Sequence, residues 1–244
     1  MGYVYAINVQ FAMKFFSFLP LTILINQSPY LIHNQGKHSP VSWRYKHSAP
    51  SSVGLNQTQF LPAVVIKDPY TWMDSMCRHS YAANWKHIDG HCPNLVPISP
   101  EEKQKINNKE TFNVNIRYRS TNITHHNSLA DLWNTWYGDW VDVEFPRLIV
   151  RFEDLLFHAE TVVEQICECG GGKIRDKAKF KYSVDSAKTG AAHKGANGLI
   201  KSITKYSDKE KRLKTFTEKD LSYALDTIRR DLMDMFRYVN PQAS

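Results

Sequence analysis

The sequence has few cysteines, and they are not spaced to bind zinc. The four are Cys77, Cys92, Cys167 and Cys169, and their spacings match no zinc site. Cys167 and Cys169 stand close together in a predicted helix, so they face different sides of it and are poorly placed to bond to each other. We expect both to be small buried apolar residues. A disulfide between Cys77 and Cys92 stays open, and it would require an oxidising compartment.

The sequence also lacks internal repeats and low-complexity tracts, which excludes a repeat array and a disordered chain. Hydrophobic residues make up 42% of its 244 residues and charged residues 23%, enough for the core of one α/β domain or two small ones. Acidic residues are the minority, 24 against 31 basic ones, and the net charge is +7. This surplus favours polyanionic partners such as nucleotides, nucleic acids, sulfated or phosphorylated substrates, or an anionic membrane. A solvated basic surface is the simpler alternative.

The N-terminal segment lacks the unbroken apolar run of a typical membrane span. Its apolar part, Tyr3–Ile25, nearly reaches the ~20 residues that a span needs. Polar residues and a proline interrupt it at Asn8, Gln10, Lys14 and Pro20. It fits a signal anchor, a signal peptide, or a buried helix or strand pair, although no basic residue precedes Lys14 as a signal peptide requires. We therefore treat residues 1–40 as an atypical N-terminal segment and residues 41–244 as the main domain.

The sequence leaves the compartment of the protein open. Asn26, Asn56 and Asn122 begin triplets that fit the N-glycosylation pattern, but such triplets are common by chance. A Golgi or secretory membrane, with residues 3–25 as the membrane-associated segment, and the cytoplasm are both compatible with these features.

Alternating strands and helices predict an α/β fold with a mostly parallel sheet. Ala63–Ile66 is a short apolar run typical of a buried strand. Asp68 is placed to cap a helix that begins at Pro69 and reaches about Tyr81. In residues 128–141, aromatic and aliphatic residues recur every three or four positions, which predicts an amphipathic helix. We interpret this stripe as core rather than as a cofactor site.

The second half of the chain also predicts a buried strand followed by helices. Residues 146–152 predict a second buried strand, and the helix that follows ends at Gly170, a glycine stop. The last helix begins with Thr217 as its N-cap and Asp220 in the third helical position, close to a capping box. Apolar residues line one face of this helix as far as Phe236, which predicts a single continuous helix.

Two basic motifs predict sites for an anion. Lys67 follows the first buried strand, and Ser75 lies in the next helix. Ligands of open parallel sheets bind beyond the carboxyl ends of strands, and a helix N-terminus favours an anion. The simpler interpretation is a surface lysine and an ordinary helix serine. In His193–Gly198, "HKGANG", a backbone N–H and an ammonium group can converge on one anion, with a plain flexible loop as the alternative.

These motifs resemble landmarks of the sulfotransferases that use 3′-phosphoadenosine 5′-phosphosulfate (PAPS). Lys67 and Ser75 resemble the family's 3′-phosphate motif, in which a basic residue ends a strand and a serine follows in the helix. His193–Gly198 resembles its late basic-Lys-Gly-x-x-Gly loop, which closes over the same phosphate. Val150–Leu156 resembles its strand ending in aromatic-Glu-Asp. Tyr45–Pro50 falls where the family has the strand end that supplies the catalytic base. The landmarks occur in the family's order.

The resemblance implies a three-layer sandwich around a central, mostly parallel sheet of the P-loop NTPase type. It implies transfer of a sulfuryl group from PAPS to an acceptor hydroxyl or amine, without a metal. His47 would be the catalytic base, and Lys46 would stabilise the sulfuryl group or the leaving oxygen. The nucleotide would be held by Lys67, Ser75, Phe152, His193, Lys194 and Gly195. The acceptor is not identified by any motif, and a carbohydrate is one alternative.

The chain departs from the family where the donor's 5′-phosphosulfate should bind. The family begins with a strand, a Gly-rich loop that cradles this group, and a helix. Residues 1–40 contain only Gly2 and Gly36, so we expect the fold to be incomplete at this end. Loss of even one donor to a developing charge typically costs about 100-fold or more in rate. A missing cradle therefore argues against turnover.

Other departures concern single side chains. Lys67 stands where arginine is usual, which gives a point charge instead of a planar fork. His193 also stands where arginine is common. Phe152 stands where the family often has a tyrosine, so a hydroxyl contact is lost.

Three functions compete on this evidence. The first is PAPS-dependent sulfuryl transfer. The second is a non-catalytic or truncated relative that keeps only the 3′-phosphate half-site. The third is a basic nucleic-acid-binding domain, which we rank last because it needs exposed aromatic residues and the tryptophans fall on a helix stripe predicted to be buried.

Overall fold

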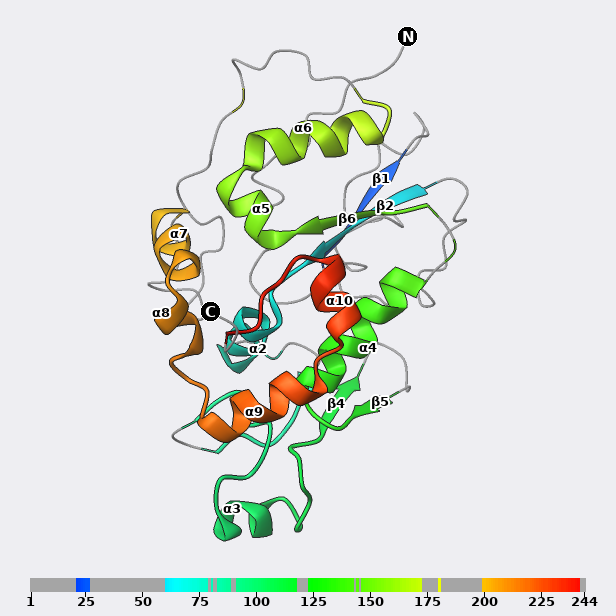
Figure 1. Ribbon diagram of the computed structural model, residues 1–244. Coiled ribbons are helices and arrows are strands. Elements are labelled where there is room, and N and C mark those ends of the chain that lie inside the picture. Colours follow the sequence, from blue (N-terminus) through cyan, green and yellow to red (C-terminus); the bar gives the residue numbers. More distant parts are fainter. Residues whose placement is uncertain are drawn as a thin grey trace. The chain divides into compact units, whose positions relative to one another are not determined.

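The computed structural model describes residues 21–26, 60–78, 80, 83–88, 91–117, 123–142, 144, 146–172, 180 and 199–241 (Figure 1). The chain forms two compact units that are interleaved along the sequence. Unit 1 consists of Met1–Lys67 and Val143–Ser207. Unit 2 consists of Asp68–Asp142 and Asp208–Ser244. Lys67 is therefore the last residue of the first segment of unit 1, and Ser75 belongs to unit 2.

Unit 1 contains a small mixed sheet. Its strands are β1 (Leu21–Asn26), β2 (Phe60–Ile66) and β6 (Leu148–Arg151), in the order β1-β2-β6. β1 runs antiparallel to β2, and β6 runs parallel to it, with Ile66 opposite Arg151. The two buried strands predicted from the sequence are thus neighbours in one sheet, and their carboxyl ends meet at the same edge.

Helices of unit 1 pack on the apolar residues of β2 and β6. They are α5 (Phe152–Phe157), α6 (Ala159–Cys169) and α7 (Leu199–Ser207). The buried cluster includes Val65, Val150, Phe152, Leu155, Leu156, Val163 and Ile166, and α7 packs against it with Leu199, Ile203 and Tyr206. α6 ends at Gly170, as predicted. The core of unit 1 therefore consists of residues from β2 and β6 and from the helices that pack on them.

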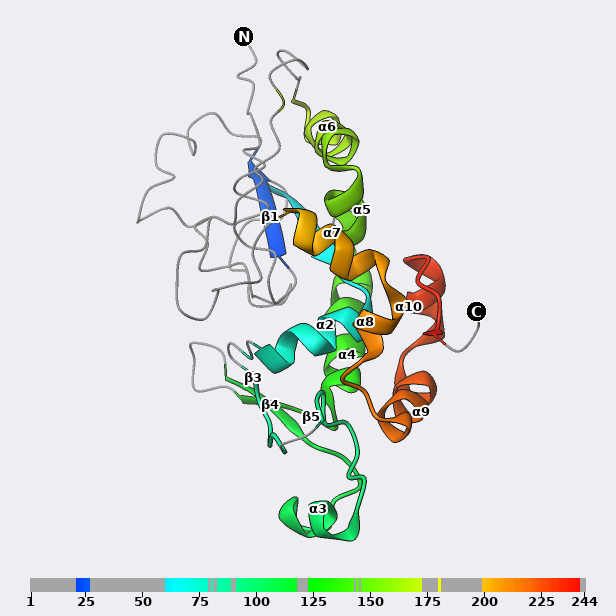
Figure 2. The ribbon, with the colours of Figure 1, turned by 90° about the vertical axis from the view of Figure 1, so that its left-hand side faces the viewer.

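Unit 2 is a helical unit with a small antiparallel sheet. Its helices are α2 (Pro69–Arg78), α3 (Pro100–Lys105), α4 (Leu129–Asp142), α8 (Lys209–Leu213), α9 (Glu218–Thr227) and α10 (Arg230–Met235). Its strands are β3 (Ala83–Asn84), β4 (Val114–Arg117) and β5 (Ile123–His126), in that order and antiparallel. Figure 2 shows α4 with α2 on one side and α9 and α10 on the other.

The aromatic stripe of α4 is the core of unit 2. All its predicted members are buried: Leu129, Leu132, Trp133, Trp136, Tyr137 and Trp140. Trp133 packs edge-on against Tyr137 and against Phe236, with ring centroids 5.1 Å and 6.4 Å apart. The prediction that this stripe is core is confirmed, because its side chains are buried and Trp133 packs against Phe236 at the end of α10.

Helix starts agree with the sequence prediction. The Asp68 carboxylate accepts a hydrogen bond from Thr71 N at 2.9 Å, so it caps α2. The Thr217 side chain accepts a hydrogen bond from Asp220 N at 3.1 Å, and the Asp220 side chain accepts one from Thr217 N at 3.3 Å. This reciprocal pair is a complete capping box at the start of α9.

The prediction of one continuous final helix is wrong. The chain turns to extended backbone at Ile228 and Arg229, which separates α9 from α10. The side chain of Asn134, from α4, bridges the break. Its amide donates to Thr227 O at 2.8 Å, and its carbonyl accepts from Arg229 N at 2.9 Å. A partner from another helix thus satisfies backbone groups that would otherwise lose their bonds at the break.

The cysteine predictions are partly right. Cys77 and Cys92 form a disulfide, with their Cα atoms 6.1 Å apart. Cys167 is buried as expected, and its pKa is raised by burial and then by the neighbouring Glu168. Cys169 is exposed, so its expected burial is wrong. The reason is its place at the end of α6, on a different face from Cys167.

The mixed α/β class and the parallel pairing of the two predicted strands are therefore established. Within the described residues, no helix has the length and apolar character needed to cross a bilayer. Of the atypical segment 1–40, only Leu21–Asn26 is described, as strand β1. The rest of that segment lies outside the described residues.

Candidate functional site

The structure brings Lys67 and Phe152 together. Each residue directly follows one of the parallel strands, Lys67 after β2 and Phe152 after β6. The Lys67 ammonium nitrogen, Nζ, lies 4.9 Å from the centroid of the Phe152 ring. This is a cation–π distance, so the ring contributes an electrostatic contact as well as a hydrophobic one.

Tyr206 of α7 completes this arrangement, which we call the Lys67 site and define as Lys67, Phe152 and Tyr206. Lys67 Nζ donates a hydrogen bond to the Tyr206 hydroxyl oxygen at 2.5 Å and lies 4.7 Å from the centroid of its ring. The two rings pack edge-to-face, with centroids 5.1 Å apart and planes at 65°. The Phe152 ring and the Tyr206 hydroxyl therefore both contact the ammonium group.

Lys67 is buried, which contradicts its interpretation as an ordinary surface lysine. Only 5% of the residue is exposed. Moving an ammonium group out of water is costly unless other groups compensate it, and desolvated cation–π contacts contribute about 2 kcal/mol or more. Lys67 is thus a buried cation at the carboxyl end of two parallel strands.

The residues after Phe152 fix the junction between strand and helix. Arg151 Nε donates to the Asp154 carboxylate at 2.8 Å, and Arg151 Nη2 donates to the second oxygen of the same carboxylate. Asp154 O also accepts from His158 N at 2.8 Å. The Asp of the aromatic-Glu-Asp motif therefore positions the start of α5, and with it the ring that faces Lys67.

Ser75 is engaged inside its own helix. Only 1% of the residue is exposed, and its hydroxyl donates to Thr71 O at 2.8 Å. It also accepts from Arg78 Nη2 at 3.3 Å, while Arg78 Nη1 forms an ion pair with Asp74 at 2.6 Å. Lys67 and Ser75 fall in different units. The structure thus shows Lys67 with Phe152, and Ser75 within α2.

The remaining predicted site residues lie outside the described residues. They are the two candidate catalytic residues and the residues of the late basic loop: Lys46, His47, His193, Lys194 and Gly195.

Sequence reasoning missed Tyr206, although a signal was present. Leu199, Ile203 and Tyr206 recur at helical spacing directly after the "HKGANG" motif, and all three pack on the core of unit 1. This period identifies α7 as an amphipathic helix. It does not reveal that Tyr206 contacts Lys67, because the two residues are far apart in sequence.

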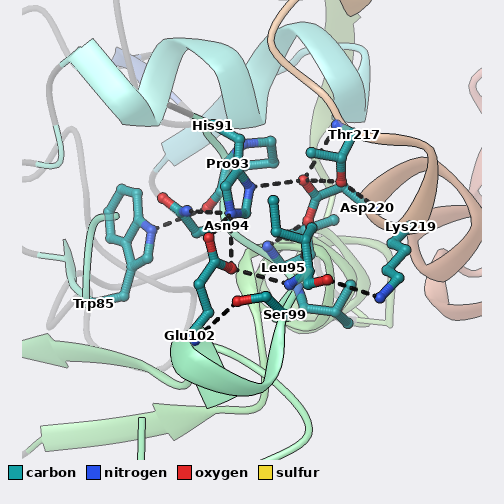
Figure 3. A network of polar contacts seen from close by, with 12 residues as sticks. Trp85, His91, Pro93, Asn94, Leu95, Ser99, Glu102, Thr217, Lys219 and Asp220 are labelled. Atoms are coloured by element: carbon teal, nitrogen blue, oxygen red, sulfur yellow. Dashed lines mark hydrogen bonds and ion pairs between the residues drawn. The ribbon is translucent and has the colours of Figure 1, made fainter. Parts of the chain in front are cut away.

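A second polar cluster lies in unit 2, and Figure 3 shows it around His91. We call it the His91 network. His91 Nδ1 lies 3.2 Å from an Asp220 carboxylate oxygen, and His91 Nε2 lies 3.1 Å from a Glu102 carboxylate oxygen. The Asn94 amide nitrogen lies 3.2 Å from the same Nε2. These contacts join the loop that contains His91 to α3 and α9.

Both carboxylates of the His91 network are also used by backbone groups. Asp220 accepts from Leu95 N at 2.8 Å and from Val96 N at 3.3 Å. Glu102 accepts from Ile98 N at 3.0 Å. Next to His91, the backbone N–H of Cys92 donates to Thr215 O at 3.4 Å, and its sulfur is bonded to Cys77. The network therefore fixes a loop in place.

Part of the His91 network could have been read from the sequence. Ser99 caps α3 and accepts from Glu102 N at 3.3 Å, with a proline at the first helical position. This is the Ser-x-x-Glu pattern of a helix start. Among the described residues, no group of three or more histidine, cysteine or acidic side chains is arranged to hold a metal ion.

Burial displaces pKa values within unit 2. The pKa of Tyr70 is raised by burial and by the nearby Asp68 carboxylate. Burial lowers the pKa of His126, with a smaller opposing effect from Asp131 and a further lowering from His125. His126 Nε2 lies 3.1 Å from the Thr124 hydroxyl. The lowered pKa of His126 favours the neutral form of its imidazole in the folded chain.

Comparisons with protein-family models, with curated proteins and with solved structures gave no match to this chain. The resemblance to PAPS-dependent sulfotransferases therefore rests on the sequence motifs alone.

Proposed function

We propose that the protein binds the 3′-phosphate of an adenosine nucleotide through Lys67, and that PAPS is its physiological nucleotide. The observation that carries the proposal is a buried lysine at the carboxyl ends of two adjacent parallel strands, in contact with Phe152. Ligands of such sheets bind at that edge. A positioned cation there is suited to a phosphate, because ion pairing is stronger away from bulk water.

The reaction that we propose is in-line transfer of the sulfuryl group to an acceptor hydroxyl or amine. Like phosphoryl transfer, it needs positioning and neutralisation of charge more than covalent catalysis. His47 would accept the proton of the attacking group, because imidazole titrates near neutral pH. Lys46 would stabilise the sulfuryl group or the leaving oxygen. Lys67, with Phe152, His193, Lys194 and Gly195, would hold the nucleotide.

The second candidate is a protein that keeps the 3′-phosphate half-site without catalysis. The absence of a Gly-rich loop in residues 1–40 supports it, because the leaving phosphate would lack backbone donors. The nucleic-acid alternative is weakened, since Trp133, Trp136 and Trp140 are buried in unit 2 and offer no exposed rings for stacking on bases.

Calorimetric titration with adenosine 3′,5′-bisphosphate, the product nucleotide, tests the proposal. We expect the wild type to bind it and Lys67→Met to bind at least about tenfold more weakly, or ~1.4 kcal/mol. Methionine is unbranched like lysine and one atom shorter, and it carries no charge. Lys201→Ala is the matched control, because it removes one positive charge from an exposed position of α7. Equal affinity of Lys67→Met and wild type would refute the proposal.

Incubation with PAPS and a panel of hydroxyl- and amine-bearing acceptors separates the two candidates. Labelled sulfate on an acceptor, lost in His47→Ala, supports the transferase. Nucleotide binding without transfer to any acceptor supports the non-catalytic half-site.

A further inference from the structure

Tyr206 brings a hydroxyl to the Lys67 site, where Phe152 has none. The resemblance to sulfotransferases implies a tyrosine at the position of Phe152, and phenylalanine has no hydroxyl to offer there. The structure shows another tyrosine, from α7, whose ring packs 5.1 Å from the Phe152 ring and whose oxygen lies 2.5 Å from Lys67 Nζ. The aromatic pair thus still carries one hydroxyl, on the opposite ring.

The chemistry of this hydroxyl suits an anion. A phenol can accept one hydrogen bond and donate another at the same time. The Tyr206 oxygen accepts from Lys67, and its O–H proton can donate to a phosphate oxygen next to the ammonium group. Hydrogen bonds to ionised groups are shorter and stronger than those between neutral groups. Lys67 and Tyr206 together would present two donors from one point, which a lone lysine cannot fix in direction.

We propose that Tyr206 is a binding residue for the 3′-phosphate and that its hydroxyl replaces the one that Phe152 lacks. This inference rests on the proposed function. It assigns to α7 a part in recognising the nucleotide: the helix carries a donor for the phosphate, in addition to covering the core with Leu199 and Ile203.

The competing role for Tyr206 is purely structural, through its ring. The ring contacts Lys67 at 4.7 Å and Phe152 at 5.1 Å, and both contacts persist without the hydroxyl. Tyr206→Phe therefore removes the proposed donor and keeps the packing. Tyr223→Phe, on α9 of unit 2, is the matched control for loss of a tyrosine hydroxyl.

Titrations with two nucleotides test the inference. Adenosine 3′,5′-bisphosphate carries the 3′-phosphate, and adenosine 5′-monophosphate lacks it. The dissociation constant of the monophosphate divided by that of the bisphosphate therefore measures recognition of the 3′-phosphate. We expect this ratio to fall about tenfold in Tyr206→Phe, the size of effect produced by losing a hydrogen bond to a charged group. The affinity for the monophosphate should not change, and Tyr223→Phe should keep the wild-type ratio.

The double variant Phe152→Tyr/Tyr206→Phe moves the hydroxyl to the facing ring. We expect it to recover part of the lost ratio, and failure to recover any of it would count against a phosphate shared by the two rings. A wild-type ratio near one would overturn the proposed function, and this inference with it. A high wild-type ratio that Tyr206→Phe leaves unchanged would overturn the assignment of Tyr206 alone.

Discussion

The Lys67 site and the His91 network each bury a basic side chain, but the groups that contact it differ. In the His91 network, two carboxylates face the imidazole, and each also accepts backbone N–H groups. In the Lys67 site, an aromatic ring and a tyrosine surround the ammonium group. Phe152 and Tyr206 carry no formal charge, and they contact Lys67 through the Phe152 ring and the Tyr206 hydroxyl.

This difference indicates different roles. Carboxylates that already bind a histidine and several backbone groups are well suited to fixing a loop, since each bond removes freedom from the chain. An aromatic ring attracts a cation without carrying an opposite formal charge of its own. We therefore expect changes in the His91 network to affect stability, and changes in the Lys67 site to affect binding. Variants of the two clusters separate these roles, and a change at Asp220 should have the largest effect.

Asp220→Ala should be the most destabilising of these changes. It removes the acceptor of Leu95 N and Val96 N, the capping box of α9 and one partner of His91. Breaking a buried charged network typically costs about 3–5 kcal/mol. Chemical denaturation measures this loss, with Asp231→Ala, in an exposed ion pair with Arg229, as the control that should change little. An Asp220→Ala protein as stable as that control would contradict a structural role for the network.

Removal of the Cys77–Cys92 disulfide should have the next largest effect. The bridge links residues 15 apart. A loop of this size corresponds to a stabilisation of about 3 kcal/mol. The double variant Cys77→Ala/Cys92→Ala should unfold at a correspondingly lower denaturant concentration. Wild type in a reducing agent should match it, and Cys169→Ala should behave as untreated wild type.

Lys67→Met should show the opposite pattern to Asp220→Ala. The variant loses the cation–π contact with Phe152 and the hydrogen bond to Tyr206 but keeps most of the packing, so we expect a smaller loss of stability than for Asp220→Ala. Binding of adenosine 3′,5′-bisphosphate should nevertheless fall at least about tenfold. Denaturation and calorimetry on the same preparations measure both quantities. A large loss of stability without a specific loss of binding would place Lys67 with the structural residues.

The smallest expected effect is the pH dependence that comes from His126. Burial lowers the pKa of His126 in the folded chain, whereas histidine in the unfolded chain keeps its ordinary pKa of about 6.5. As the pH falls below about 6.5, the unfolded chain therefore binds more protons than the folded chain. Stability should therefore be present above that pH and decline towards the lower pKa of the folded state. His126→Gln should reduce this slope. It should not abolish it, because burial also lowers the pKa of His87. His158→Gln, at an exposed position of unit 1, is the control, and a slope unchanged in His126→Gln would contradict the assignment.

Much of the fold followed from local sequence patterns. The apolar run of β2, the Asp68 cap of α2, the aromatic stripe of α4 and the Thr217 capping box are all formed by residues within a few turns of one another. Propensity, capping and periodicity act at this range, so a single sequence contains the information.

The features that the sequence did not predict depend on distant residues. Asn134 bridges the break between α9 and α10, His91 joins α3 to α9, and Tyr206 contacts Lys67. Each contact joins residues whose proximity is created by tertiary packing. The Lys67 site illustrates the division: its lysine and phenylalanine follow strand patterns that the sequence displays, whereas its tyrosine depends on where α7 packs.

The most direct test of the account is the ratio of the affinities of wild type and Lys67→Met for adenosine 3′,5′-bisphosphate and for adenosine 5′-monophosphate. The account predicts that wild type favours the bisphosphate and that Lys67→Met loses most of this preference while it remains folded. A wild type that binds both nucleotides equally, or neither, would contradict the claim that Lys67 is buried at the strand ends to hold a 3′-phosphate.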